Sequence, residues 1–330
     1  MIGKTLVLFL SVCAPLQSHA EPAEAAHNHL AEHEAARLQF CQVRGLQPRT
    51  GRRPKIWDTF IVNLEADLLE IRFHETAAYV DHFVVVESAV STTGHPKRTM
   101  FDEIRPRFAL FEDKLVYVKL ADAGDETGAT TWSRESFVRN QLTAVTTLQG
   151  IEDGDVVIVS DADEILRPDI LRSLVFCQGY DGKRMLFNMK LYYYSFNLVH
   201  KSTWGLVKGF VYNSSQPLPL ANDVRGYQSM THTFADCGWH CSCCFPTISM
   251  IRNKIRSYGH AENTDNKEIQ EREWIVNVVR KGLDLYGRAS ETYSFIEPED
   301  VPKYVSANAV RFSYLLDRRA PSAGFSDFLD

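Results

Sequence analysis

The chain has 330 residues, 45% hydrophobic and 24% charged, which suffices for one large α/β domain with tails and, by length alone, also permits two domains. This composition excludes a disordered chain. The formal net charge is -6, and no run of Lys and Arg outweighs the acids over the portion expected to fold, which argues against a nucleic-acid partner.

The first 20 residues have the order of a signal peptide. Lys4 precedes an apolar stretch over residues 6–14, and small residues lead up to Ala20. The apolar stretch is shorter than the ~20 residues of a comfortable membrane span. We therefore predict entry into the secretory pathway, with residues 1–20 acting as either a cleaved signal peptide or a short N-terminal membrane anchor. Residues 21–54, rich in Ala, Glu, His and Arg, are predicted to form a stem or linker.

From residue 56 onward the pattern is one of alternating strands and helices. Residues 57–62 are predicted to form a strand, 64–80 a helix with two apolar stripes, and 82–88 a second buried strand. Strand, helix and strand within about thirty residues predict a βαβ unit with a right-handed crossover. A further strand is expected at 115–119, followed by a helix after Thr131.

The second half of the chain is richer in aromatic residues. A short helix is expected after Pro168, strands over 184–196 and 204–212, and a helix over 266–281. Residues 300–330 are predicted to be a C-terminal tail. The alternation of strands and helices predicts an α/β fold with a mostly parallel central sheet and helices on both faces.

An acidic stretch directly follows the most apolar strand of the chain. Residues 156–159 are β-branched and apolar, and Asp161, Asp163 and Glu164 come where this strand ends. Ligands of open α/β sheets bind at this edge, and carboxylate oxygens are the ligands that a hard divalent cation prefers. The alternative is that one Asp caps the next helix and the other acids are solvated.

Cysteines agree with a lumenal location. Outside the leader the six cysteines are Cys41, Cys177, Cys237, Cys241, Cys243 and Cys244. An even number in a lumenal chain indicates disulfides. A zinc site at the cluster 237–244 is a second reading, but no second pair of ligands accompanies it, so we favour a disulfide.

Five motifs in order resemble glycosyltransferase family 17, over a region from about Trp57 to about Arg288. They are Asp58-Thr-Phe, Glu65-x-Asp-Leu-Leu-Glu-Ile-Arg72, Phe83-Val-Val-Val-Glu-Ser88 with Gly94-x-Pro-Lys97, Ser160-Asp-Ala-Asp-Glu-Ile165, and Gly238-Trp-His-Cys-Ser242. One departure falls in the region expected to bind the acceptor, where Cys243 replaces the usual aromatic residue.

The resemblance implies a GT-A type nucleotide-sugar-binding fold and a catalytic domain spanning residues 55–299. It also implies a UDP-GlcNAc donor, a divalent metal such as Mn²⁺, inversion at the anomeric carbon and residence in the Golgi lumen. The acceptor implied is a mannose of N-glycans on glycoproteins, modified through a β-1,4 linkage. A tether to the Golgi membrane would run through the N-terminal segment.

Roles for single residues follow from these expectations. Asp161 and Asp163 would bind the metal that bridges the diphosphate and assists the departure of UDP. Glu87 would accept hydrogen bonds from the nucleoside, while Lys97, Arg72 and Arg139 are candidates for phosphate or sugar contacts. For Arg72 the competing interpretation is an ion pair with Glu65 or Asp67, and for Arg139 it is a solvated position on its helix.

An inverting transferase also needs a carboxylate base close to the acceptor hydroxyl. Glu164, Asp236 and Glu262 are the choices, and we favour Glu262 because the resembling family keeps an acid after the same basic segment. Trp239 and His240 are predicted to form a stacking platform for the acceptor sugar, against the alternative that Trp239 is a core residue.

Three other functions remain open at this point. The first is the same fold with another sugar nucleotide or with an acceptor other than an N-glycan, because motifs specify the fold more closely than the acceptor. A non-catalytic glycan-binding protein would keep the scaffold without using Asp161 and Asp163. A metal module at the cysteine cluster is the third.

Overall fold

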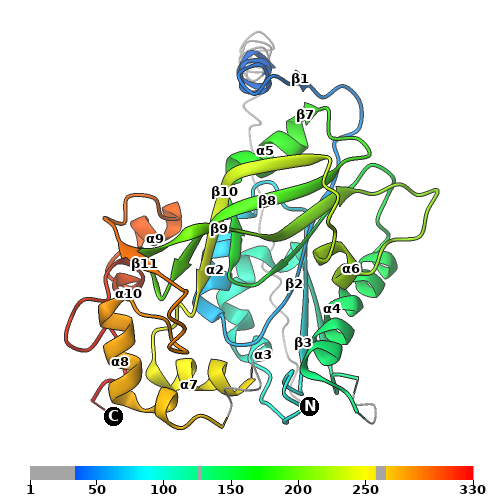
Figure 1. Ribbon diagram of the computed structural model, residues 1–330. Helices are drawn as coiled ribbons and strands as arrows, with labels where there is room; N and C mark the ends of the chain where they lie inside the picture. The colour runs from blue at the N-terminus through cyan, green and yellow to red at the C-terminus, as the bar shows by residue number, and fades with distance from the viewer. Residues whose placement is uncertain (1–33, 125–127, 258–264, 330) are drawn as a thin grey trace, which may run out of the picture.

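The computed structural model of this protein describes residues 34–124, 128–257 and 265–329. Within these ranges the chain forms a 9-stranded mixed sheet, a separate 2-stranded sheet, and helices packed around the larger sheet (Figure 1). The strands are β1 (Gln47–Pro48), β2 (Ile56–Ile61), β3 (His82–Ser88), β4 (Leu115–Leu120), β5 (Val156–Asp161), β6 (Glu164–Leu166), β7 (Cys177–Gln178), β8 (Arg184–Tyr193), β9 (Ser195–Val211), β10 (His232–Ser242) and β11 (Tyr293–Phe295). The predicted α/β class is confirmed.

The helices fall mainly between the strands of the first half and after the strands of the second. They are α2 (Ala66–Thr76), α3 (Phe101–Ile104), α4 (Thr131–Leu148), α5 (Pro168–Phe176), α6 (Ala221–Arg225), α7 (Ile248–Ser257), α8 (Arg272–Lys281), α9 (Lys303–Ala307) and α10 (Ser313–Leu316), with 3-10 segments η1 (Arg105–Lys114) and η3 (Glu268–Gln270). The helix predicted over 266–281 is therefore divided into η3 and α8.

Four neighbouring strands, β4, β3, β2 and β5, form the parallel half of the sheet. Their centres are apolar and largely β-branched, and Val84, Val85 and Val86 of β3 are fully buried. Such side chains pack well in a parallel sheet that is covered on both faces. The strands and the βαβ order predicted for this half agree with the structure.

The other half of the sheet has mixed strand directions. Strand β9 runs antiparallel to β5 and β8, while β10 is parallel to β8 and antiparallel to β6. A tight turn at Tyr194, whose φ is 64°, connects β8 to β9. Because so short a connection can join only antiparallel strands, the predicted mostly parallel sheet holds on one side of β5 and not on the other.

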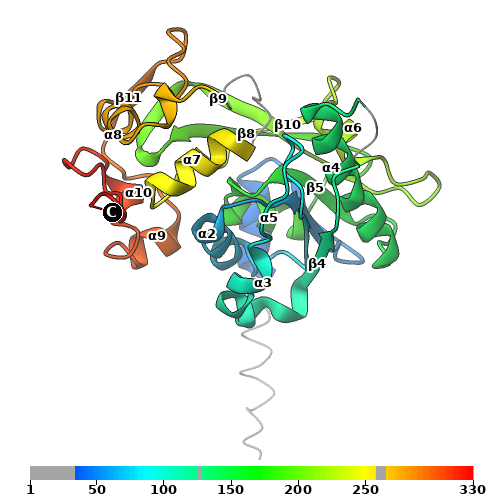
Figure 2. The same cartoon turned by 90° about the horizontal axis from the view of Figure 1, so that it is seen from below.

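Helices cover both faces of the parallel half, as predicted, and Figure 2 shows α4 and α2 on opposite sides of it. Helices α4 and α6 pack on one face around Trp57 and Leu142. Helix α2, η1 and α5 pack on the other face around Phe60 and Phe73. With both faces covered, a ligand reaches these strands at their carboxyl ends.

The segment predicted as a stem is attached to the body where the structure describes it. Residues 34–42 are helical, and Cys41 forms a disulfide with Cys177 of β7. The predicted leader, residues 1–20, lies outside the described residues. Across 34–124, 128–257 and 265–329, no helix combines the length and the apolar character needed to cross a membrane.

The segment predicted as a C-terminal tail packs against α2. Phe312 and Leu315 are buried there. Glu70 of α2 accepts hydrogen bonds from Tyr304 Oη at 2.7 Å and Arg311 Nη2 at 2.7 Å. This stretch therefore contributes to the packed body of the protein.

The cysteine cluster holds a disulfide between Cys241 and Cys244, and Cys237 and Cys243 are buried free thiols. A zinc site requires thiolate ligands, and a disulfide removes two of the four cysteines from that role. The structure thus agrees with the disulfide interpretation of this cluster and contradicts the metal module.

Candidate active site

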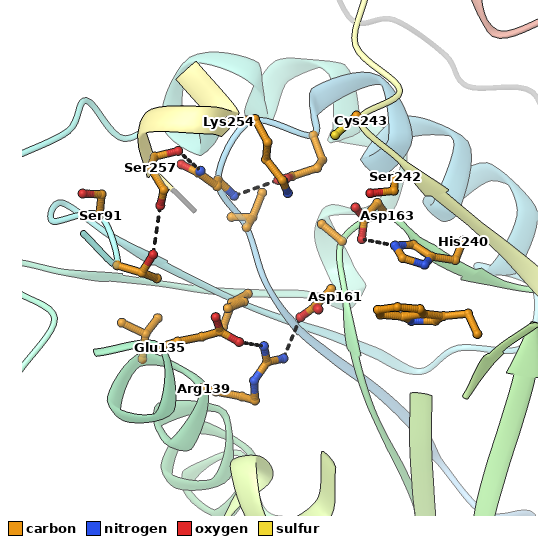
Figure 3. A pocket seen from close by; sticks show the side chains of 18 of the residues that line it. Ser91, Glu135, Arg139, Asp161, Asp163, His240, Ser242, Cys243, Lys254 and Ser257 are labelled. Atoms are coloured by element: carbon orange, nitrogen blue, oxygen red, sulfur yellow. Dashed lines mark hydrogen bonds and ion pairs between the residues drawn. The ribbon is translucent and has the colours of Figure 1, made fainter. Parts of the chain in front are cut away.

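The acidic stretch lies at the carboxyl end of β5, which is the strand where the two halves of the sheet meet. Asp161 ends β5, and β6 begins at Glu164. Asp161 and Asp163 both line a cavity of about 370 Å³, a size typical of small-molecule sites. Figure 3 shows Asp161 near Arg139 and Asp163 near His240, with the cavity around them.

Two arginines from different helices hold the Asp161 carboxylate. Its Oδ1 accepts a hydrogen bond from Arg139 Nη1 at 2.6 Å, and its Oδ2 accepts one from Arg225 Nη2 at 2.8 Å. Burial by itself would raise the pKa of Asp161, but the charges of Arg139 and Arg225 outweigh burial and hold the pKa below its ordinary value. Asp161 is therefore ionised at neutral pH.

The Asp163 carboxylate faces a histidine. Its Oδ1 lies 3.6 Å from His240 Nε2, and both side chains are buried. Burial would raise the pKa of Asp163, but the charges of His240 and Lys254 lower it below its ordinary value. Asp161 and Asp163 thus both present ionised carboxylates to the cavity.

Glu164 does not line the cavity, and hydrogen-bond donors surround its buried carboxylate. Its oxygens accept from Trp204 Nε1 at 2.5 Å, from the Asp161 backbone N–H at 2.6 Å, and from Arg225 Nη1 at 2.7 Å. A carboxylate committed to so many donors is a poor general base. Glu164 is therefore not the base. Its hydrogen bonds position the stretch 161–164, which we call the acidic loop.

Arg72 binds the backbone of the same loop and does not line the cavity. Its guanidinium forms a two-pronged ion pair with Asp58, and its Nη1 donates to the carbonyl oxygens of Asp161 (2.8 Å) and Glu164 (2.9 Å). The predicted phosphate or sugar contact is therefore replaced by a structural role. The alternative of an ion pair was correct in kind, but the partner is Asp58 and not Glu65 or Asp67.

Glu87 is also buried away from the cavity. Its carboxylate accepts from the backbone N–H groups of Met100 (2.7 Å) and Phe101 (3.0 Å) and from Tyr117 Oη (3.0 Å). The predicted contact with a nucleoside is not available to a carboxylate that holds α3 in this way. Lys97, whose Nζ lies 3.4 Å from Glu87, does line the cavity.

Neighbouring residues of β10 face opposite sides of the sheet, so Trp239 and His240 do not share a platform. His240 lines the cavity, whereas Trp239 Nε1 donates to the Asp300 carbonyl at 3.1 Å on the other side. Trp239 is a core residue, in agreement with the alternative stated for it. Asp236, in an irregular part of β10, pairs with Arg167 at 3.0 Å and does not line the cavity, which removes it from reach of a ligand there.

Glu262, the favoured base, lies outside the described residues. The chain leads towards the cavity just before it, because Lys254 and Ser257 of α7 both line the cavity. Figure 3 shows these two side chains on the side of the cavity opposite Arg139.

Sequence reasoning missed several cavity residues. Glu135 pairs with Arg139 one helical turn away at 2.6 Å, a spacing that the sequence displays. The others come from segments that only the tertiary fold brings together. They are Trp204, Tyr193, Tyr286, Arg288, Glu291 and Tyr293.

Three cavity residues have buried polar atoms that form no regular hydrogen bond within the described residues. These atoms are Glu135 Oε2, Tyr193 Oη and His240 Nδ1. Buried polar groups are nearly always paired in folded proteins, so unpaired ones gathered at one cavity indicate a place where a ligand supplies the partners.

The donor set suits a cation that is held only in part by protein. No group of three or more His, Cys, Asp or Glu side chains arranged for a metal occurs among residues 34–124, 128–257 and 265–329. Asp161 and Asp163 do offer ionised oxygens to the cavity. Cations that bind with phosphates often use one or two carboxylates and take their other ligands from the phosphates and water, so these residues fit such an ion.

Comparison with known proteins identifies the family. The family described as Glycosyltransferase family 17 matches residues 5–320. The chain therefore belongs to glycosyltransferase family 17, as its motifs predict.

Curated relatives carry the name β-1,4-mannosyl-glycoprotein 4-β-N-acetylglucosaminyltransferase. The Homo sapiens protein is 29% identical and the Rattus norvegicus protein 28% identical over 307 residues, which cover 82% of this chain and 56% of each relative. The chain thus spans about half the length of the curated relatives that it matches.

Among solved structures, similarity is found to the mannosyltransferase PcManGT from Pyrobaculum calidifontis in complex with GDP-Man and Mn²⁺. The identity is 13%, and the match covers 93% of this chain and 84% of that chain. The TM-score is 0.35, which is too low to define a shared fold.

Proposed function

We propose that this protein is an inverting, metal-dependent glycosyltransferase of GT-A type. It transfers GlcNAc from UDP-GlcNAc to a mannose of N-glycans on glycoproteins and forms a β-1,4 linkage. The observation that carries the proposal is the pair Asp161 and Asp163, which is kept ionised at the carboxyl end of β5 inside a cavity of about 370 Å³. Membership of family 17 and the names of the relatives support the reaction.

The donor is proposed to lie over the parallel half of the sheet. This side of the cavity carries Lys97, whose positive charge suits a diphosphate. Arg139 also lines it, but its guanidinium pairs with Asp161 and Glu135, so its proposed part is to hold Asp161. Asp163 and Asp161 would hold Mn²⁺ there, and the bound ion would supply Lewis-acid assistance to the departure of UDP. Arg139 and Arg225 keep Asp161 oriented and charged for this purpose.

Glu262 is retained as the proposed base that takes the proton of the acceptor hydroxyl. The bond from the acceptor oxygen to the anomeric carbon forms as the bond from that carbon to the phosphate oxygen breaks, which gives inversion. Support comes from the cavity residues Lys254 and Ser257, because Glu262 follows Ser257 by only five positions in the chain.

A Golgi location is proposed on the basis of the leader pattern in residues 1–20, which would act as a signal peptide or a membrane anchor. The disulfides Cys41–Cys177 and Cys241–Cys244 suit an oxidising lumen.

The test is linkage analysis of the product after incubation with UDP-GlcNAc, Mn²⁺ and a defined biantennary N-glycan. We expect a β-1,4-linked GlcNAc on mannose. Loss of a metal ligand removes several kcal/mol of transition-state stabilisation, so Asp163→Ala should lower the rate on the order of 1000-fold. Asp113→Ala, which removes an exposed carboxylate that does not line the cavity, serves as the matched control.

Equal activity of Asp163→Ala and wild type would overturn the proposed role of the acid pair. Glycan binding without any turnover by either protein would favour the non-catalytic glycan-binding alternative.

A second candidate function keeps the mechanism and changes the substrates. Cys243 lines the cavity at a position where the resembling family has an aromatic residue, and this favours a different acceptor. A panel of sugar nucleotides and acceptors separates the two candidates, because best turnover of a donor other than UDP-GlcNAc, or of an acceptor other than an N-glycan, selects the second.

A further inference from the structure

The cavity differs in chemistry on the two sides of the acidic loop. Lys97 and Arg139 lie on the side of the parallel strands. On the side of β8, β9 and β10, the lining includes a group of aromatic and charged side chains that we call the aromatic wall: Tyr193, Tyr286, Tyr293, Arg288 and Glu291. Figure 3 shows Glu135 and Arg139 on one side of Asp161, and His240 and Cys243 on the other.

Contacts between distant segments fix the wall in place. The rings of Tyr193 and Tyr293 stack with centroids 4.6 Å apart and planes within 10°. Tyr293 belongs to β11, where it pairs with His200 of β9. His200 Nε2 lies 3.1 Å from Glu291 Oε2, so the strand pairing also positions the acid.

Arg288 is anchored in a similar way. It donates to Asp284 through Nη2 at 2.7 Å and through Nε at 3.1 Å, and Asp284 is buried. The side chains of Arg288 and Glu291 remain 44% and 31% exposed, so their polar ends are accessible from the cavity. The wall is thus rigid and still presents hydrogen-bonding groups.

One polar atom of the wall lacks a regular partner. The Tyr193 hydroxyl is buried beside Cys243 and forms no hydrogen bond of regular geometry within the described residues. Burial raises the pKa of Tyr193 well above its ordinary value, so the hydroxyl is neutral and can donate to a ligand oxygen.

We propose that the aromatic wall is the subsite for the acceptor sugar, a neutral hexopyranose. This inference rests on the proposed function and adds the place and the residues of acceptor recognition. A hexopyranose has an apolar C–H face, which matches an aromatic ring, and a rim of hydroxyls, which matches Tyr193 Oη, Arg288 and Glu291. One arginine and one glutamate give the wall no formal net charge, which suits a neutral sugar better than a phosphate.

The direction of attack supports the same placement. In an inverting displacement the acceptor oxygen approaches the anomeric carbon from the side opposite the departing phosphate. With the nucleotide over the parallel half and the acidic loop at the centre, the acceptor comes from the side of β8 and β9, where the wall lies.

Two conservative variants test the subsite, Tyr193→Phe and Glu291→Gln. Tyr193→Phe removes one hydroxyl, Glu291→Gln removes one negative charge, which also faces His200, and both keep the size of the side chain. We expect each to raise the KM for a biantennary N-glycan by roughly 3- to 10-fold, the effect of one hydrogen bond, at saturating UDP-GlcNAc. The KM for UDP-GlcNAc and the rate of its hydrolysis without acceptor should stay at wild-type values. Tyr180→Phe is the control, because Tyr180 is a buried tyrosine whose hydroxyl contacts Ser173 outside the cavity.

Direct binding of the same glycan, measured by saturation-transfer NMR in the presence of UDP, separates the inference from the proposed function. If wild type transfers GlcNAc but neither variant changes the KM for the glycan, the subsite is wrong and the function stands. If wild type does not transfer but binds the glycan, and Tyr193→Phe weakens that binding, the subsite stands and the function fails. Unchanged glycan binding in both variants, or a parallel rise in the KM for UDP-GlcNAc, overturns the subsite.

Discussion

The two halves of the central sheet differ in the length of their strands and in the way these strands pair. Strands β2, β3, β4 and β5 have 6 or 7 residues each and pair in parallel along short apolar runs. Strand β9 has 17 residues, changes from buried to exposed and back, and pairs with three different strands. The first half follows from local patterns, whereas the second depends on contacts between distant segments.

The acidic loop connects the two halves, because Asp161 ends β5 and Glu164 begins β6, which pairs with β10. Arg139, on α4 over the parallel half, holds one oxygen of Asp161. Arg225, on α6, which packs against α4, β5 and β9, holds the other oxygen and also Glu164. The charge state of Asp161 therefore depends on arginines from two helices, α4 and α6, and substitutions can test each contribution separately.

The largest effect is expected from breaking the support beneath the loop. Arg72→Met leaves the Asp58 carboxylate buried without its cation and frees the carbonyl groups of the loop. Removing one partner of a buried ion pair costs about 3–5 kcal/mol. Urea unfolding followed by circular dichroism measures this loss.

The double variant Arg72→Met with Asp58→Leu is the informative control, because replacing both charges with apolar groups restores much of the stability. A free energy of unfolding for Arg72→Met within about 1 kcal/mol of wild type would show that Arg72 does not support the loop.

The second largest effect is expected at Arg225 of α6. Arg225→Ala removes the cation that Asp161 and Glu164 share. Residues that orient metal ligands typically change metal affinity about 10- to 100-fold, and we expect a loss of that size for Mn²⁺ in the presence of UDP. Titration calorimetry with Mn²⁺ measures it, on protein whose near-ultraviolet circular dichroism matches wild type.

Arg184→Ala is the matched control for this variant. Arg184 is an exposed arginine of β8 that stacks on Tyr227 and contacts neither acid. Weakening of Mn²⁺ binding to the same extent in both variants would mean that the contact made by Arg225 is not responsible, because the loss of positive charge alone would favour a cation.

The predictability of the site follows the same division. Asp161, Asp163 and Arg139 could be found from sequence because acids directly follow an apolar run and the arginine lies on the preceding helix. Arg225, Trp204 and the aromatic wall could not, since tertiary packing alone brings them to the cavity.

Two errors had local causes. The predicted platform of Trp239 and His240 is wrong, because strand alternation places neighbouring residues on opposite faces of the sheet. Glu87 is predicted to contact the nucleoside because it lies at the end of a strand. Its carboxylate instead accepts hydrogen bonds from the backbone N–H groups at the start of α3. An acid at the end of a strand can therefore be predicted to bind a ligand only if no nearby backbone N–H groups already use its carboxylate.

A third effect tests how the C-terminal segment is held to the parallel half. Burial alone would raise the pKa of Glu70, but hydrogen bonds from Arg311, Tyr304 and Arg107 lower it to about 2. A lowered pKa gives stability that is present above the ordinary value of 4.5 and is lost as the pH falls towards 2. Glu70→Gln should therefore show a weaker dependence of unfolding on pH between these values.

At neutral pH the same variant should lose about 1.5 kcal/mol, near the lower end for hydrogen bonds to charged groups, because Arg311 and Arg107 are partly exposed. Thermal unfolding at a series of pH values, compared with Glu112→Gln on the surface, measures both quantities. Identical pH profiles for wild type and Glu70→Gln would contradict the role of Glu70.

The smallest effect comes from a feature that is entirely local. Thr130 caps the start of α4, where its side chain accepts a hydrogen bond from the Ser133 N–H at 3.1 Å. Thr130→Ala should cost about 1 kcal/mol, and Thr130→Ser should cost much less because serine caps equally well. Since α4 carries Arg139 but is also held by its packing on β2 and β3, we expect Mn²⁺ affinity to change less than in Arg225→Ala. A larger loss of Mn²⁺ affinity in Thr130→Ala than in Arg225→Ala would mean that the local order of α4, and not the contact made by Arg225, governs the acidic loop.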